Sequence, residues 1–409
     1  MVWCRNCLRS SALVALAAAQ ALALQVPAGT EIQIRLKSKV ASKISQPNDA
    51  VEAQVIAPVM AGHVYAIPAG APVHGTVALV QASNGDQRAL LWLRFTTVEV
   101  SGSPVAIAAR VTAVDNAREK VDAQGQIVGI LASDTAAGKL SSELGALDEK
   151  LGDKLGGIAG VLSNATKAVT KRVDQDVTFD AGVEMTLQLT APALLKAPGG
   201  PGPLGNLRPV PDRAALAALA AGEPFQTVAQ KPPKDSDLTN VMLIGDREQL
   251  DQAFADAGWH LASSLNPVAK FETIEALAED KGYAEAPVSI LMLEGKPPDI
   301  VFEKLNDTFA RRHHLRVWLR PDQYHGRPVW VVAATHDMGI NFSEANRTFI
   351  HRIDSSIDRE RQKVVDDLVL TGRVASLLLV NRSAIPQHAQ NATGDNLVTD
   401  GKIAVLVLQ

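Results

Sequence analysis

The sequence predicts an α+β protein of two domains: a small β-barrel or sandwich, then an α+β domain with a mostly antiparallel sheet. At 409 residues the chain is long enough to bury more than one core. In the first half, short runs of alternating apolar and polar residues follow turns that contain glycine. A stretch rich in Pro and Gly lies near the middle and is typical of a domain boundary. Beyond it, strand-like and helix-like patterns are mixed, which indicates an α+β fold.

The first 23 residues have the pattern of a secretory signal peptide. Arg5 and Arg9 precede the apolar run SALVALAAAQALA, and this run ends in a small-x-small cleavage pattern at 21–23. We expect cleavage after Ala23. The alternative is an uncleaved membrane anchor, but the run is shorter than the roughly 17–25 residues that span a bilayer.

Charge and cysteine content limit the kinds of site, partner and cellular location that we expect for the mature chain. Both cysteines, Cys4 and Cys7, lie in the leader, so we expect no disulfide and no thiolate metal site after cleavage. The net charge of −4 gives no broad basic surface for nucleic acid. No later segment has the length of apolar sequence that a transmembrane helix needs. We expect an exported protein of the periplasm or cell envelope, with other envelope proteins or the envelope surface as partners.

Residues 24–190 are predicted to form the barrel-like domain. Ala-Gly turns at Gly29, Gly70 and Gly182 each lead into an alternating strand, because glycine adopts the positive φ that such turns need. The Asn-Gly-Asp sequence at 84–86 predicts a hairpin. Residues 141–173 repeat leucine or isoleucine at spacings of three and four, which predicts a helical insertion in this domain.

The N-terminal region resembles the barrel domain of the TrbI-like conjugation-channel proteins. The segments that carry the resemblance are VPAGTEIQIRLKSKVAS, AIPAGAPVHGTV and RALLWLRFTTVEVSG. The membrane helix that precedes the barrel in that family has no counterpart in this sequence. The resemblance therefore implies a fold, and a secretion-channel role does not carry over.

Residues 191–237 are expected to be a linker, and residues 238–409 the C-terminal domain. VMLIG predicts a strand, Asp246 with Gln249 a capping box for the next helix, and Gly258 its end. A second helix is expected from Ser355 to the stop at Gly372. Further strands are expected at Val288 to Leu293, Ile300 to Leu305, Arg312 to Leu319, Pro328 to Thr335, Val374 to Val380 and Ile403 to Leu408.

Residues 240–372 resemble the LssY C-terminal domain. The blocks that carry this resemblance are VMLIGDREQLDQAFADAGW, APVSILMLEGKPPDIVFEK, RRHHLRVW, GRPVWVVAATHDMGI and HRIDSSIDRER, in that order. The family occurs in bacterial envelope proteins, often attached to membrane domains of the DedA or phosphatidic-acid-phosphatase type. The resemblance implies an envelope protein and no particular reaction.

Five of the nine histidines fall within 311–360, between two apolar strands and a helix start. The turn after the first strand should bring the second strand back antiparallel, so that its polar end lies beside the first. Two kinds of site fit the side chains that would gather there. An anion such as phosphate would be held by Arg312, His314, Arg316 and Arg352. A divalent metal would be held by His336, Asp337, His351 and Asp354.

A third reading is a purely structural network of His–Asp and Arg–Asp hydrogen bonds. The sequence holds no HExxH, GxSxG or P-loop motif that would favour catalysis. The leading hypothesis is therefore a non-catalytic binding or scaffold module of the cell envelope. The alternative is a metal-assisted hydrolase of phosphoesters that uses the His/Asp cluster. The sequence alone does not decide whether the protein is an enzyme.

Overall fold

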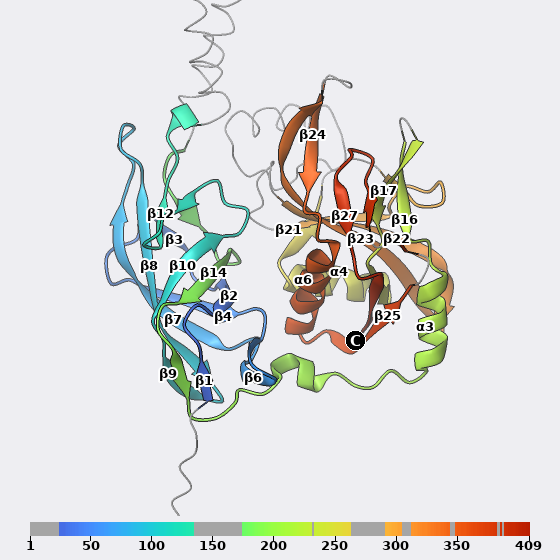
Figure 1. Ribbon diagram of the computed structural model, residues 1–409, viewed down its shortest axis with the longest axis horizontal. Coiled ribbons are helices and arrows are strands. Elements are labelled where there is room, and N and C mark those ends of the chain that lie inside the picture. Colours follow the sequence, from blue (N-terminus) through green and yellow to red (C-terminus); the bar gives the residue numbers. More distant parts are fainter. Residues whose placement is uncertain are drawn as a thin grey trace, which may run out of the picture.

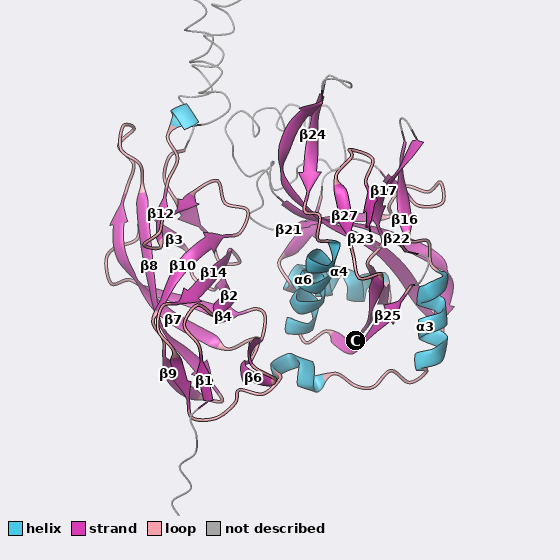
Figure 2. Ribbon diagram, viewed as in Figure 1, coloured by secondary structure: helices cyan, strands magenta, loops and turns pink. Residues whose placement is uncertain are grey.

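The computed structural model describes residues 24–134, 174–230, 233–262, 291–304, 312–343, 348–382, 385–386 and 388–409, without the side chains of 132, 339–343 and 348–351. The expected signal peptide 1–23 and helical insertion 141–173 lie outside the described residues. The predicted α+β fold is confirmed. Strands dominate the described part of the chain, and its α-helices are α3, α4 and α6 (Figure 2).

The first domain is a nine-stranded antiparallel sheet that curls into a nearly closed barrel, on the left of Figure 1. Its order is β10-β14-β2-β4-β7-β8-β12-β11, with β9 paired to β8. The elements are β1 (Leu24–Val26), β2 (Glu31–Leu36), β3 (Val40–Ala41), β4 (Ala50–Val55), β5 (Val59–Ala61), β6 (Val64–Ile67), β7 (Pro72–Gln81), β8 (Leu90–Val100), β9 (Ser103–Ala106), β10 (Ala109–Val114), β11 (Lys120–Val121), β12 (Gln126–Val128), η1 (Ala132–Asp134), β13 (Thr178–Phe179), β14 (Glu184–Leu189) and β15 (Ala193–Leu195).

The glycine turns act as the sequence predicts. Gly29, Gly70 and Gly182 have φ of 86°, 85° and 104°, a region that residues with a Cβ avoid. The amide of Gly182 donates to Leu36, which starts the pairing of β14 with β2. The inward residues of β2, β8 and β14 alternate along each strand and form one apolar core inside the barrel.

The second domain is built on an eight-stranded sheet of order β19-β21-β22-β23-β18-β28-β25, with β24 paired to β23. Among the described pairs of this sheet, β18–β28 is parallel and the others are antiparallel, as predicted. The elements are η3 (Gly202–Asn206), α3 (Arg213–Gly222), β16 (Gln226–Gln230), β17 (Pro233–Leu238), β18 (Val241–Ile244), α4 (Arg247–Asp256), β19 (Trp259–Leu261), β20 (Leu291–Met292), β21 (Ile300–Lys304), β22 (Arg312–Tyr324), β23 (Arg327–Ser343), β24 (Thr348–Ile353), α6 (Ile357–Leu370), β25 (Val374–Asn381), β26 (His388–Gln390), β27 (Asn396–Val398) and β28 (Lys402–Leu408).

Helices cover both faces of this sheet. α4 and α6 bury their apolar sides against one face, and α3 packs on the other. The capping box of Asp246 and Gln249 is present as predicted, and Gly258 follows α4 with φ of 82°. α6 ends just before Gly372, whose φ is 75°. Figure 1 shows α6 on the side of the sheet that faces the barrel.

The segment 191–237, expected to be a linker interrupted by a short helix from Arg213 to Ala221, contains that helix as α3 and further regular structure. Leu216 and Ala220 of α3 are fully buried against the sheet of the second domain, and Leu204 packs beneath α6. β16 and β17 pair with each other. These contacts attach the part of the segment from Leu204 onward to the second domain, ahead of the boundary expected at residue 238, whereas β15 in the same segment pairs with β1 of the barrel. The Pro and Gly content that suggested a linker does not predict these contacts.

Within the described part of the chain, none of the helices combines the length and apolar character needed to cross a bilayer.

Candidate functional site

The histidine-rich stretch forms two paired strands in the register that the sequence suggested. Arg312 on β22 lies opposite Asp337 on β23, and His313 lies opposite His336. β24 adds to the other edge of β23, and the amide of Asp354 donates to the carbonyl of His336. Because neighbouring residues of a strand face opposite sides of the sheet, the polar side chains divide into two groups.

The first group is a buried network of arginines and carboxylates. Arg312 donates from Nη1 to Glu303 (2.9 Å) and from Nε to Asp337 (3.1 Å). Arg316 Nη1 donates to Asp237 (2.9 Å). Every member is at most 4% exposed. An anion would have to compete with three carboxylates at this place.

His314 belongs to the same network. Its Nε2 accepts from Arg316 Nη1 (3.1 Å) and lies 2.8 Å from the hydroxyl of Thr335. Arginine can only donate, so the ring proton is on Nδ1, which is 3.6 Å from Asp337. Of the four residues predicted to bind an anion, the structure thus brings together Arg312, His314 and Arg316. The Arg352 side chain is 61% exposed and lies outside the network, 3.6 Å from Asp395.

The charges of this network explain why the pKa of Glu303 is raised. Two guanidinium groups face the three carboxylates of Glu303, Asp337 and Asp237, so one carboxylate is in excess. Burial raises the pKa of Glu303 to about 8, with Asp337 adding to the shift and Arg312 opposing it. Glu303 therefore retains its proton at neutral pH. As a neutral acid it still accepts the hydrogen bond from Arg312 Nη1.

The raised pKa predicts how stability depends on pH. An unfolded glutamate titrates near about 4.3, so between that value and about 8 the folded state binds more protons than the unfolded state. Stability should fall as pH rises through this window, by at most about 1.4 kcal/mol per pH unit. Glu303→Gln keeps a neutral side chain, and the difference in free energy of unfolding between variant and wild type should grow with pH. Urea unfolding across the window measures this, and a constant difference would contradict it.

The second group lies between the two domains. Both ring nitrogens of His313 meet carboxylates: Nδ1 is 2.8 Å from Glu360 on α6, and Nε2 is 2.9 Å from Asp115, which follows β10 in the barrel. Burial alone would lower the pKa of His313, but Glu360 and Asp115 raise it well above the usual value. His313 is therefore an imidazolium that joins the barrel to the second domain.

His336 stacks on His313, with ring centroids 4.0 Å apart and planes inclined by 18°. Its Nε2 lies 2.8 Å from Oδ1 of Asn116 in the barrel. Burial lowers the pKa of His336, and the positive charge of His313 lowers it further. The pair thus holds one charged and one neutral imidazole.

A buried ion network continues the interface. Arg35 of β2 donates to Glu184 of β14 (2.7 Å) and to Asp367 of α6 (2.6 Å). Lys304 of β21 donates to Asp367 (2.7 Å), and Lys363 of α6 bonds Glu184. Burial alone would raise the pKa of Glu184, but Lys304, Lys363 and Arg35 hold it well below its usual value. The domains are joined by paired charges that removal of one partner would leave uncompensated.

A cavity of about 800 Å³ opens beside this interface. Both domains contribute to its walls, through Glu31, Gln33, Ile56, Ala57, Ala113, Val114, Asp115, Asn116, Glu184, Met185 and Thr186 of the barrel and His313, Thr335, His336, Met338, Asp354, Ser356, Ile357, Arg359, Glu360, Gln362, Lys363 and Asp366 of the second domain. The carboxylates outnumber the cationic side chains in this lining. The cavity therefore suits a ligand with positive charge.

Of the four residues predicted to bind a metal, the structure describes the side chains of three and separates them. His336 and Asp354 line the cavity, whereas Asp337 faces the arginine network on the opposite side of β23. The side chain of His351 lies outside the described residues. A different trio gathers instead: Asp115, His313 and His336 each have a possible ligand atom within 4.8 Å of those of the other two. Sequence reasoning missed Asp115 and Glu360, because Asp115 comes from the other domain and Glu360 resembles any exposed helix glutamate.

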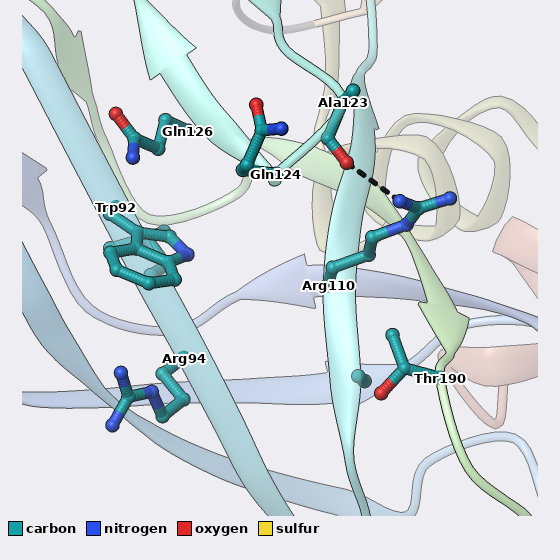
Figure 3. Close-up of a pocket in the computed structure, with 9 residues that line it drawn as sticks. Trp92, Arg94, Arg110, Ala123, Gln124, Gln126 and Thr190 are labelled. Carbon is teal, nitrogen blue, oxygen red and sulfur yellow. Dashed lines mark hydrogen bonds between the residues drawn. The ribbon is translucent and has the colours of Figure 1, made fainter.

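A smaller hollow of about 350 Å³ lies on the outside of the barrel (Figure 3). Trp92 and Arg94 of β8 form one side, and the guanidinium of Arg94 sits 5.3 Å from the Trp92 ring. Arg110 of β10 lies on the other side and donates to the carbonyl of Ala123 (2.6 Å). Only residues of the barrel line this hollow, and none of His313, His314 and His336 is among them.

Comparison with known proteins gives one family match. The family model described as LssY C-terminus matches residues 224–403, which include the region where the sequence resembled that family. ComB10 of the Com type IV secretion system of Helicobacter pylori is similar over 42% of this chain and 92% of that chain, with 13% identity and a TM-score of 0.23. No curated protein matches the chain. Residues 224–403, which supply α6 and both histidine strands, therefore match the LssY C-terminal domain family.

Proposed function

We propose that this chain is an exported bacterial cell-envelope protein, and that it acts as a non-catalytic binding or scaffold module. The leader-like pattern of the first 23 residues supports export. The LssY C-terminal domain supports the envelope, since the family that the sequence resembles occurs in envelope proteins. The binding site in this proposal is the cavity between the domains.

One observation carries the proposal: the cavity is walled by two domains that charged pairs hold together. The bonds of Asp367 to Arg35 and of His313 to Asp115 cross from one domain to the other. A site shared by two domains is a common place for ligands, because the interface leaves a concave, pre-formed surface. The lining offers charge and hydrogen bonds from both sides at fixed positions.

The same bonds argue against His313 as a general base. A histidine acts as a general base through a ring nitrogen with a free lone pair near the substrate. In His313 both nitrogens already hold protons toward carboxylates. The charge of this ring thus pairs with carboxylates of both domains, and the cavity offers recognition through other lining groups such as Asp354 and Arg359.

Photo-crosslinking tests the proposed site. Met338 lines the cavity and is 49% exposed, while Leu379 on β25 is 47% exposed and does not belong to the lining. A p-benzoylphenylalanine placed at Met338 in bacteria should give a defined adduct with an envelope component in the exported fraction. The same group at Leu379 serves as the matched control. Absence of an adduct at Met338, or equal adducts at both positions, would contradict the proposal.

The alternative function is a metal-assisted hydrolase of phosphoesters. The trio Asp115, His313 and His336 favours it, because two histidines and a carboxylate are ligands that zinc accepts in hydrolases. Hydrolysis of p-nitrophenyl phosphate by the purified mature chain with added zinc or manganese would support it. Turnover that disappears in His336→Ala would replace the binding proposal with this one.

A further inference from the structure

We infer that Asp115, His313 and His336 form a divalent-metal site that spans the two domains. The donor set is two imidazoles and one carboxylate, a combination that suits zinc, iron(II) and manganese(II). The inference deepens the proposed function and rests on it for the location of the site, since the trio lies in the wall of the same cavity. The inference identifies a divalent cation as the positively charged ligand that the carboxylate-rich lining of this cavity would bind.

The spacing of the donors fits an ion. His313 Nε2 and Asp115 Oδ2 are 2.9 Å apart. Two ligand atoms of a tetrahedral zinc ion, with bonds of about 2.0–2.1 Å, stand about 3.3 Å apart. A small separation of the two side chains therefore admits the ion between them. The ion takes the lone pair of Nε2, and the proton that joined the two groups is released to solvent.

Neighbouring residues already hold the histidines as metal ligands are held. Metal-bound histidine usually donates its other N–H to a carboxylate or carbonyl, which fixes the ring and makes the ligating nitrogen more basic. Glu360 Oε2 lies 2.8 Å from Nδ1 of His313 and fills that role. The amide oxygen of Asn116 does the same for Nε2 of His336, at 2.8 Å, which assigns Nδ1 as the nitrogen of His336 that would ligate.

The remaining coordination positions face the cavity. The side chain of Asp115 is 34% exposed, whereas that of His313 is 4% exposed, so the open side of the trio is the side of the cavity. Water or a ligand group would complete the coordination there. Because Asp115 comes from the barrel and both histidines from the second domain, the bound ion would also tie the domains together.

The test is a titration of the purified, metal-free mature chain with Co²⁺ and then Zn²⁺. We expect one Co²⁺ per chain, with the visible absorption of a site containing nitrogen ligands, and displacement by Zn²⁺. His336→Ala and Asp115→Asn should abolish this absorption. Glu360→Gln, which weakens the support of His313, should reduce affinity by roughly 10–100-fold. These positions are chosen in place of His313, whose replacement threatens folding.

His74 provides the matched control. It pairs with Glu99 on the barrel at 3.2 Å, so it is also a histidine beside a carboxylate, but it lies apart from the trio. His74→Ala should bind Co²⁺ as the wild type does. Binding that persists in both His336→Ala and Asp115→Asn, with circular dichroism showing folded proteins, would overturn the inference. So would a wild-type chain that binds no ion, and neither result would affect the crosslinking from Met338.

Discussion

Asp367→Asn is expected to destabilise the protein by roughly 3–5 kcal/mol, because it breaks a buried charged cluster from one side. The Asp367 side chain is 2% exposed and accepts from Arg35 and Lys304, and from the indole of Trp259 at 3.0 Å. Asparagine cannot balance the two cations that remain buried. Urea unfolding of the purified mature chain, followed by circular dichroism, measures the loss.

The adjacent residue gives the control for this prediction. Asp366 makes one side-chain bond, to Gln362, and burial raises its pKa to about 6. The neutral Asp366→Asn should not destabilise the protein, since it removes no buried ion pair and relieves a carboxylate whose charge burial disfavours. Equal losses for the two variants would mean that the interdomain cluster does not contribute as the structure indicates.

Arg312→Met should also cost roughly 3–5 kcal/mol. Its guanidinium is the partner of Glu303 and Asp337 in a place that water does not reach, since all three are at most 2% exposed. Methionine fills similar space but leaves the buried charge of Asp337 uncompensated and the protonated Glu303 without its donor. Arg352→Ala is the control, because that side chain is 61% exposed and should contribute little.

The two arginine variants also separate a structural network from an anion site. An open anion site would lose little stability on removal of Arg312 and would bind phosphate in the wild type. A change of less than about 1 kcal/mol, together with an increase in melting temperature on adding phosphate, would favour the anion site that the sequence suggested. Thermal melts of the wild type and both variants, with and without phosphate, decide between the two.

Local features of the fold follow directly from the sequence. The capping box at Asp246 and the turn glycines such as Gly182 depend on residues within a few positions of one another. The antiparallel pairing of β22 with β23 follows from two apolar runs and a short turn, and it correctly puts Arg312 beside Asp337. Alternation along a strand also assigns His313 and Arg312 to opposite faces.

The set of residues that make up the site between the domains could not be predicted from local sequence patterns. The partners of His313 are Asp115, which is 198 positions away, and Glu360, which is 47 positions away. Their meeting depends on how the barrel docks on α6, and no local pattern encodes that contact. The same holds for Lys304 and Glu184, which look like solvent-exposed residues of strand ends in the sequence but are buried at the interface.

A double-mutant cycle between Arg35 and Asp367 tests most directly whether the two domains form one unit around a shared site. These residues are 332 positions apart, and their side chains meet only if the barrel docks on α6 as described. Free energies of unfolding are measured for wild type, Arg35→Gln, Asp367→Asn and the double variant. We predict that the two losses fall short of additivity by roughly 1.5–3 kcal/mol, the coupling of residues in direct contact within one network. Losses that add within about 0.5 kcal/mol would mean that the residues do not touch, and would contradict the shared interface and the site built on it.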